Sequence, residues 1–126
     1  MKQVIATREA PEAVGPYSQA IVVGDMLFCA GQIPLDPSTG ALIAGDITAQ
    51  TTRVLENVKA VLRANHMTFS DVVKSTVFMI DLAQFAAMNA VYAKFFSEPF
   101  PARSTVQVAA LPKGASVEIE VIAVRA

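Results

Sequence analysis

Arg103 is the residue of this sequence that is best suited to bind a small acid. It follows Phe100-Pro101-Ala102, so a turn that contains proline leads the arginine into an expected strand and fixes its place. A guanidinium presents a planar fork of donors that matches a carboxylate, and it keeps its charge at any working pH. The sequence therefore predicts a carboxylate site at Arg103. The alternative is a structural ion pair with Glu118 or Glu120.

Glu118 is the best candidate for activating water. A carboxylate on a partly buried face of a sheet can accept a proton from a positioned water molecule. Glu120 is its rival, since residues two apart on one strand share a face. The spacing alone does not decide which of the two enters a site.

Three further residues are of types that line ligand sites. Tyr17 follows a Gly-Pro turn and could project its phenol into a cleft, although a tyrosine that begins a strand is more often a core residue. Gly31 ends an expected strand, where it would leave an N–H free for a ligand; a simple bulge is the alternative. Asn89 lies among apolar positions of an expected helix and should have a specific partner, most often a core group.

Other kinds of chemistry have less support in the sequence. His66 follows a helix and is expected at the surface. Cys29 lies in an apolar strand and is expected to be a buried thiol rather than a nucleophile. Metal catalysis is not predicted, because no His, Cys or carboxylate cluster has ligand spacing, and no Gly-rich phosphate loop is present.

The first part of the chain has the pattern of an antiparallel hairpin. Apolar runs at 18–23 and 26–31 flank Gly24-Asp25, a pair suited to a two-residue turn. A shorter strand precedes them at the N-terminus. Residues 35–40 gather Pro, Asp, Ser and Gly and predict a loop.

Two helices and three further strands are expected in the rest of the chain. Apolar residues at helical spacing predict a helix from the N-cap Asp46 to about Asn65-His66. Asp81 caps a second one over 82–95, which must end before Pro99. Short runs rich in β-branched residues predict strands at 72–80, 103–108 and 116–124. This order indicates a single α+β domain over 1–126, with a mixed sheet and two helices on one of its faces.

The uncovered face of such a sheet is informative. In 117–124 the odd-numbered residues are all apolar and suit the helices, whereas the opposite row reads Glu118, Glu120, Ile122 and Val124. In 103–108 an alternating row reads Arg103, Thr105 and Gln107. A face that is half apolar and half charged predicts a subunit interface around a polar cleft. A solvated sheet with cross-strand ion pairs is the alternative.

Composition limits the partners that the chain can have. Hydrophobic residues make up 53% of 126 residues, more than so small a domain can bury internally, so a homo-oligomer is expected. A net charge of −1 with scattered Lys and Arg predicts no nucleic-acid partner. No apolar run approaches the roughly 20 residues that span a bilayer, so no membrane partner is expected. One cysteine fits a reducing compartment, and we expect a cytoplasmic protein.

Four segments resemble the Rid family, also called the YjgF-type family. They occur in the family's order and read GPYSQA at 15–20, AGQIP at 30–34, FPARS at 100–104 and VEIEV at 117–121. The likeness covers essentially the whole chain, and Pro-Ala-Arg-Ser is the family's signature. The most similar branch is the RidA type. The resemblance implies a chorismate-mutase-like fold and a homotrimer with clefts between neighbouring subunits.

The resemblance also assigns roles to individual residues. It carries the family's carboxylate-binding arginine onto Arg103 and its water-positioning glutamate onto Glu118. Its tyrosine, cleft glycine and asparagine fall on Tyr17, Gly31 and Asn89. Two cleft positions differ from many RidA-type proteins: Ala30 replaces a small hydroxyl residue, and Thr105 replaces a cysteine. Thr105 is therefore a candidate for contact with the substrate.

The activity implied is the hydrolysis of reactive enamines and imines. The substrates would be 2-iminopropanoate and 2-iminobutanoate, and the products 2-oxo acids and ammonia, with no cofactor. Such an activity would protect pyridoxal-phosphate enzymes from enamine attack. The main alternative is a non-catalytic regulator or chaperone of the same family that binds a small carboxylate. A ribonuclease is less favoured, because the chain lacks a basic face for RNA.

Overall fold

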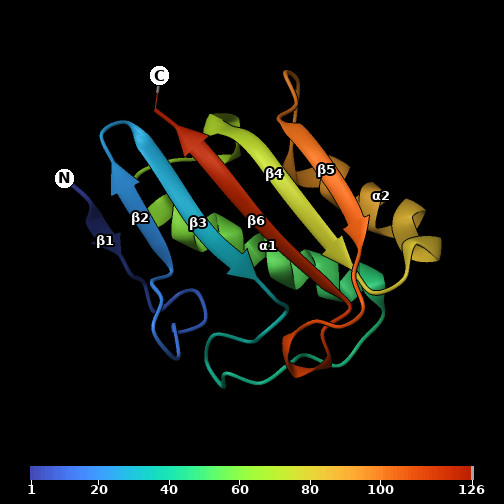
Figure 1. Ribbon diagram of the computed structural model, residues 1–126. Helices are drawn as coiled ribbons and strands as arrows, with labels where there is room; N and C mark the ends of the chain where they lie inside the picture. The colour runs from blue at the N-terminus through green and yellow to red at the C-terminus, as the bar shows by residue number, and fades with distance from the viewer. Residues whose placement is uncertain (126) are drawn as a thin grey trace.

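The structure is one mixed β-sheet with two helices on one of its faces (Figure 1). The computed structural model describes residues 1–125. The sheet has six strands in the order β1-β2-β3-β6-β4-β5. The strands are β1 (Gln3–Ile5), β2 (Ala20–Val23), β3 (Met26–Gln32), β4 (Val72–Met79), β5 (Ala102–Gln107) and β6 (Val117–Val124). The α+β class and the order of elements predicted from the sequence are confirmed.

The helices are α1 (Ile47–Ala64) and α2 (Phe85–Phe95). Asp46 begins α1 as predicted, because its carboxylate accepts a hydrogen bond of 2.9 Å from the backbone N–H of Ala49. Asp81 caps a short 3-10 turn, Leu82–Gln84, that leads into α2. The second predicted helix is therefore two segments, and its first turn has the tighter geometry.

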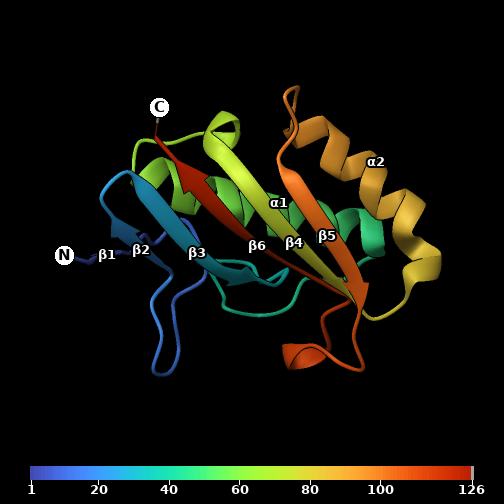
Figure 2. The ribbon, with the colours of Figure 1, turned by 45° about the horizontal axis from the view of Figure 1, so that its top comes forward.

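Strand pairing follows from the connections. β2 and β3 form the predicted hairpin, with Val23 opposite Met26. β4 and β5 are parallel, because the chain must cross over through α2 before it can return to the same edge. Figure 2 shows α2 beside these two strands, on the side of the sheet that α1 covers. β6 fills the place between β3 and β4 and is antiparallel to both.

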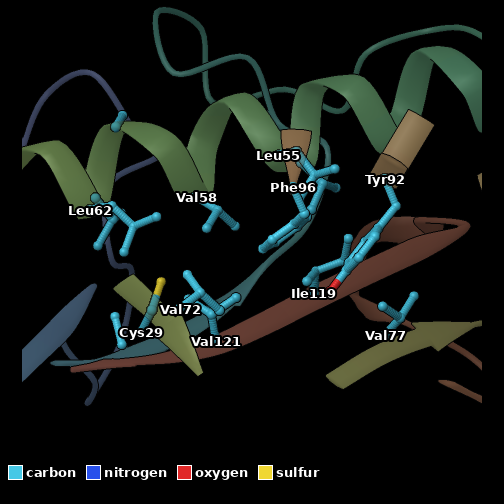
Figure 3. Close-up of a cluster of buried hydrophobic side chains, with 14 of the residues drawn as sticks. Cys29, Leu55, Val58, Leu62, Val72, Val77, Tyr92, Phe96, Ile119 and Val121 are labelled. Carbon is cyan, nitrogen blue, oxygen red and sulfur yellow. The ribbon is translucent and has the colours of Figure 1, made fainter. Parts of the chain in front are cut away.

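The core lies between the sheet and the helices (Figure 3). Val117, Ile119, Val121 and Ala123 of β6 are at most 2% exposed, so the predicted apolar row does face the helices. Leu55, Val58 and Leu62 of α1 are fully buried against this layer. Cys29 lies in the same core, where burial raises the pKa of its thiol to about 12. The predicted burial of this thiol is confirmed.

The other face of the sheet is uncovered in the single chain, as predicted. On this open face Glu118 lies opposite Phe78, and Glu120 lies opposite Thr76. Large apolar side chains are also exposed there, among them Val4 at 64%, Phe28 at 41% and Val106 at 40%. The mixed apolar and charged character deduced from the sequence is confirmed for the β6 residues of this face. The sequence also placed the row Arg103, Thr105 and Gln107 on the uncovered face, which is wrong: this row pairs with buried residues of β4 and lies on the helix side.

No helix within residues 1–125 is both long enough and apolar enough to cross a membrane.

Candidate functional site

Arg103 lies on the helix side of β5. The parallel register pairs it with Ser75 of β4, which is fully buried beneath the helices. Because side chains of directly paired residues point to the same face, Arg103 and Thr105 point toward α2. Glu118 and Glu120 belong to the opposite face, with Phe78 and Thr76. The alternative of an ion pair between Arg103 and either glutamate is therefore wrong.

Three residues of α2 surround the guanidinium. Arg103 Nη1 donates a hydrogen bond of 2.8 Å to Asn89 Oδ1. The guanidinium carbon lies 4.7 Å from the ring centroid of Tyr92 and 5.5 Å from that of Phe85. Both distances are typical of cation–π contact. Within residues 1–125 no carboxylate pairs with this cation, so its charge is balanced by an amide and two rings.

Asn89 and Tyr92 also line a hollow that Arg103 borders. Its volume is about 370 Å³, and Ala93, Phe100 and Pro101 complete its walls. Asn89 has the specific partner that was expected from its amide, and that partner is Arg103. The arrangement is a half-buried cation at the edge of a small hollow, which suits the carboxylate of a small molecule.

The sequence reasoning missed the aromatic neighbours of Arg103. Phe85, Asn89 and Tyr92 are spaced by four and three residues, so one stripe of α2 presents all three to β5. In the sequence, this spacing predicts only that α2 buries one face. The same stripe carries two rings and an amide, and this combination is the signal that could have indicated a cation site.

Thr105 is next to Arg103 on the same side of β5. Its hydroxyl is buried, and it has no hydrogen-bond partner within the described residues. A buried hydroxyl without a partner costs stability unless another molecule supplies one. The unpartnered hydroxyl thus makes Thr105 a candidate for contact with a ligand, independently of the resemblance to RidA-type proteins, many of which have a cysteine at this position.

Glu118, Gly31 and Tyr17 form a second group on the open face. They line a hollow of about 560 Å³ together with the segments around 11–14, 30–35 and 112–113. Burial, and secondly the charge of Glu120, raises the pKa of the Glu118 carboxyl. Glu120 is exposed and does not line this hollow. Of the two candidates, Glu118 is the one that lines this hollow.

Gly31 is required by the position of Glu118. The Glu118 carboxylate lies where a Cβ on residue 31 would be, so a larger residue would displace it. The register between β3 and β6 also shifts between Cys29 and Gln32, as the bulge interpretation of Gly31 predicted. A free N–H of Gly31 for a ligand stays a prediction. Beyond the strand, Asn57 of α1 donates hydrogen bonds of 3.2 and 3.0 Å to the carbonyls of Ile33 and Leu35. These bonds hold the wall of the hollow against α1.

Tyr17 is a rim residue rather than a core residue. Its side chain is 56% exposed, and its hydroxyl accepts a long hydrogen bond of 3.4 Å from the backbone N–H of Val14. The common expectation for a tyrosine at the start of a strand does not hold here. His66, by contrast, is exposed just beyond the end of α1, as predicted.

The structure therefore brings the predicted residues together in two groups rather than one. Arg103, Asn89 and Thr105 belong to the helix side of the edge strand β5. Glu118, Gly31 and Tyr17 belong to the open face, and their hollow shares no lining residue with the hollow at Arg103. No single chain can apply both groups to one small molecule in this arrangement.

Known proteins resemble the chain over its whole length. Residues 7–125 match the family model described as Endoribonuclease L-PSP. The 2-iminobutanoate/2-iminopropanoate deaminase of Salmonella typhimurium is 52% identical over 128 residues, covering 99% of this chain and 99% of that protein. A crystal structure from Thermotoga maritima has a TM-score of 0.98 and 52% identity, covering 100% of this chain and 99% of its own. That of Escherichia coli TdcF with bound serine has a TM-score of 0.93 and 48% identity, covering 98% and 99%.

The fold, the motifs and these similarities define one class of protein. The chain belongs to the family of that model, the YjgF or Rid family.

We expect Gly31→Ala to move Glu118 without unfolding the protein. The added methyl group meets only the mobile end of a side chain, so the free energy of unfolding should change by less than about 1 kcal/mol. The displaced carboxylate would gain water, and its pKa should fall toward the ordinary range. NMR titration of the Glu118 carboxyl carbon measures this, with Glu118→Gln to assign the signal. An unchanged titration would show that Gly31 does not set the position of Glu118.

Proposed function

We propose that this protein hydrolyses reactive 2-imino acids, such as 2-iminopropanoate and 2-iminobutanoate, to 2-oxo acids and ammonia. The observation that carries the proposal is the state of Arg103. A half-buried guanidinium held by an amide and two rings, with no carboxylate partner in residues 1–125, is a prepared receptor for a substrate carboxylate.

The relatives support the substrate class. The Salmonella protein at 52% identity carries the name of this deaminase. TdcF at 48% identity was crystallised with serine, an amino acid that has a carboxylate next to a carbon bearing nitrogen. A 2-imino acid has the same arrangement of carboxylate, carbon and nitrogen, with a double bond to the nitrogen.

In the proposed mechanism Arg103 fixes the carboxylate and Asn89 keeps the guanidinium aligned. The imine carbon next to the carboxylate is electrophilic, and holding it beside a water molecule supplies much of the acceleration. Glu118 accepts a proton from water as the water oxygen bonds to that carbon and the C=N π electrons move onto the nitrogen of the protonated imine, which gives a carbinolamine. Glu118 then returns this proton to the nitrogen. The C–N bond breaks as the hydroxyl oxygen forms the carbonyl of the 2-oxo acid, and the hydroxyl proton passes through Glu118 to the released ammonia, which leaves as ammonium. The raised pKa of Glu118 suits a group that takes up a proton and returns it.

The remaining predicted residues would shape the site. Tyr17 would close the rim with its phenol, and the backbone N–H of Gly31 would orient the substrate. Thr105 would offer its unpartnered hydroxyl to the substrate beside Arg103.

A complete site of this kind requires two copies of the chain. Arg103 and Glu118 lie on opposite faces of the sheet, so we propose that the arginine of one subunit meets the glutamate of its neighbour. The exposed apolar residues of the open face supply a surface that a neighbouring subunit would bury. A homotrimer with a cleft at each subunit boundary would satisfy both observations.

Arg103→Ala should abolish the acceleration of imine hydrolysis. A threonine dehydratase coupled to this protein generates 2-iminobutanoate, and 2-oxobutanoate formation is followed while semicarbazide competes for the imine. The wild type should accelerate release of the oxo acid, and Arg103→Ala should return it to the rate without protein. Glu118→Gln should retain binding but lower kcat by roughly 10²–10⁴-fold, the usual contribution of general acid–base catalysis.

The matched control for that assay is Arg63→Ala, which removes an exposed arginine at the end of α1 and should leave the rate unchanged. If the wild type gives no acceleration yet binds 2-oxobutanoate through Arg103, the non-catalytic regulator of the same family replaces the enzyme.

Mixing inactive subunits should restore activity if two chains form each site. Arg103→Ala and Glu118→Gln subunits, unfolded together and refolded as a mixture, would produce some boundaries that hold an intact arginine and an intact glutamate. In an equal mixture, half of the boundaries receive an intact arginine, and half of those also receive an intact glutamate from the neighbour. Random assembly therefore predicts about a quarter of the wild-type rate. Light scattering reports the number of subunits. Activity no higher than that of the separate variants would place both residues in one chain's site.

Thr105→Val should stabilise the protein and weaken the binding of the substrate. Removing a buried hydroxyl without a partner should raise the free energy of unfolding by about 1 kcal/mol. The KM for the imine should rise several-fold, because the substrate loses a hydrogen bond. Thr51→Val is the control: Thr51 in α1 also buries an unpartnered hydroxyl and should gain similar stability without a change in KM. Equal kinetics in the two variants would remove Thr105 from the site.

A further inference from the structure

Tyr92 connects Arg103 to the interior of the protein. Its ring lies under the guanidinium at 4.7 Å, closer than the ring of Phe85. The side chain is only 5% exposed, and it reaches from α2 into the layer between helix and sheet (Figure 3). One side of the ring therefore faces the cation, and the rest belongs to the core.

The hydroxyl of Tyr92 is held by a residue of the sheet. Tyr92 Oη and Ser75 Oγ lie 2.6 Å apart in a hydrogen bond that is buried from solvent. Burial raises the pKa of the Tyr92 phenol, so its hydroxyl stays protonated, and either of the two hydroxyls can donate in this bond. Ser75 is also the residue directly paired with Arg103 across the two strands. The bond thus ties the ring to the strand residue beside the arginine.

The ring is also held by aromatic packing. Tyr92 stacks on Phe96 with ring centroids 4.2 Å apart and an angle of 19° between the planes. Phe96 in turn contacts Phe69 edge to face, with centroids at 4.8 Å. The ring of Tyr92 is therefore fixed at its hydroxyl and along its stacked face, and neither attachment requires the arginine.

We infer that Tyr92 is a positioning residue for Arg103: its fixed ring sets the direction in which the guanidinium fork meets the substrate carboxylate. The inference deepens the proposed function and rests on it. Asn89 gives the arginine a single hydrogen bond, which leaves the long side chain free to pivot about that contact. A rigid surface beneath the planar cation removes this freedom before the substrate binds, so less entropy is lost on binding.

The test compares Tyr92→Leu with Phe96→Leu. Both substitutions remove one ring of the same stack, and the two side chains are similarly buried at 5% and 4% exposure, so both variants should lose thermal stability. Tyr92→Leu should lose more, because it also leaves the buried hydroxyl of Ser75 without its partner. Of these two side chains, only Tyr92 contacts Arg103. Tyr92→Leu should raise the KM for the imine and the Kd for 2-oxobutanoate about tenfold, with kcat within a factor of about three. Phe96→Leu should change both constants far less, because the hydrogen bond to Ser75 still holds the ring, and Tyr92→Phe, which keeps the ring and its stacking, should recover most of the affinity.

A spectroscopic measurement separates this inference from the proposed activity. The Nε–Hε NMR signal of Arg103, identified by its loss in Arg103→Lys, should be displaced by the ring currents of its aromatic neighbours. In Tyr92→Leu the signal should move toward those of exposed arginines, and in Phe96→Leu it should stay in place. If the wild type shows no deaminase activity, the proposed function fails, and this signal still decides whether Tyr92 positions Arg103. An Arg103 signal unchanged in Tyr92→Leu, or equal effects of the two Leu variants on affinity, would overturn the inference.

Discussion

The parallel pairing of β5 with β4 is the constraint on which the rest of the site depends. The chain leaves β4, forms α2 and returns at the edge of the sheet, and this crossover places α2 directly above the new strand. The register then sets Arg103 beside Ser75, on the face that α2 covers. A shift by one residue would turn Arg103 to the open face and bury Ser104 in its place. The amide, the two rings and the serine hydroxyl around the arginine all follow from this register.

The same pleat sends the catalytic candidates to opposite sides of the sheet. β6 buries its odd-numbered residues and presents Glu118 on the open face, next to the backbone of Gly31. The open face combines this partly buried carboxylate with exposed apolar side chains, a composition that suits contact with another subunit more than contact with water alone. Two half-sites on different faces are an efficient arrangement for an oligomer, because each subunit boundary can join one half from each neighbour.

The sequence predicted the elements and their order, because periodicity reports which residues are buried. Alternation in 117–124 identified the core row of β6, and the spacing of apolar residues identified both helices. The parallel β4–β5 register follows from the position of α2, and no local pattern contains it. The alternation in 103–108 therefore assigned the row of Arg103 to the wrong face of the sheet, and the ion pair with Glu118 or Glu120 remained open. The sequence did not identify Phe85 and Tyr92 as site residues for a related reason. An apolar stripe on a helix has the same spacing whether it packs on aliphatic groups or on a cation.

The environment of Arg103 also favours an anionic ligand. Moving a guanidinium out of water costs free energy, and an amide oxygen and two ring faces offset only part of that cost. A carboxylate of the protein at this position would offset more of it. That carboxylate would also occupy the N–H donors of the guanidinium and leave none for a substrate. Within residues 1–125 the guanidinium instead has no carboxylate partner, and the hydroxyl of Thr105 beside it has no hydrogen-bond partner. A small acid could give both groups the partners that they lack within the described residues. Interactions that do not stabilise the folded protein alone would then stabilise the complex with the acid.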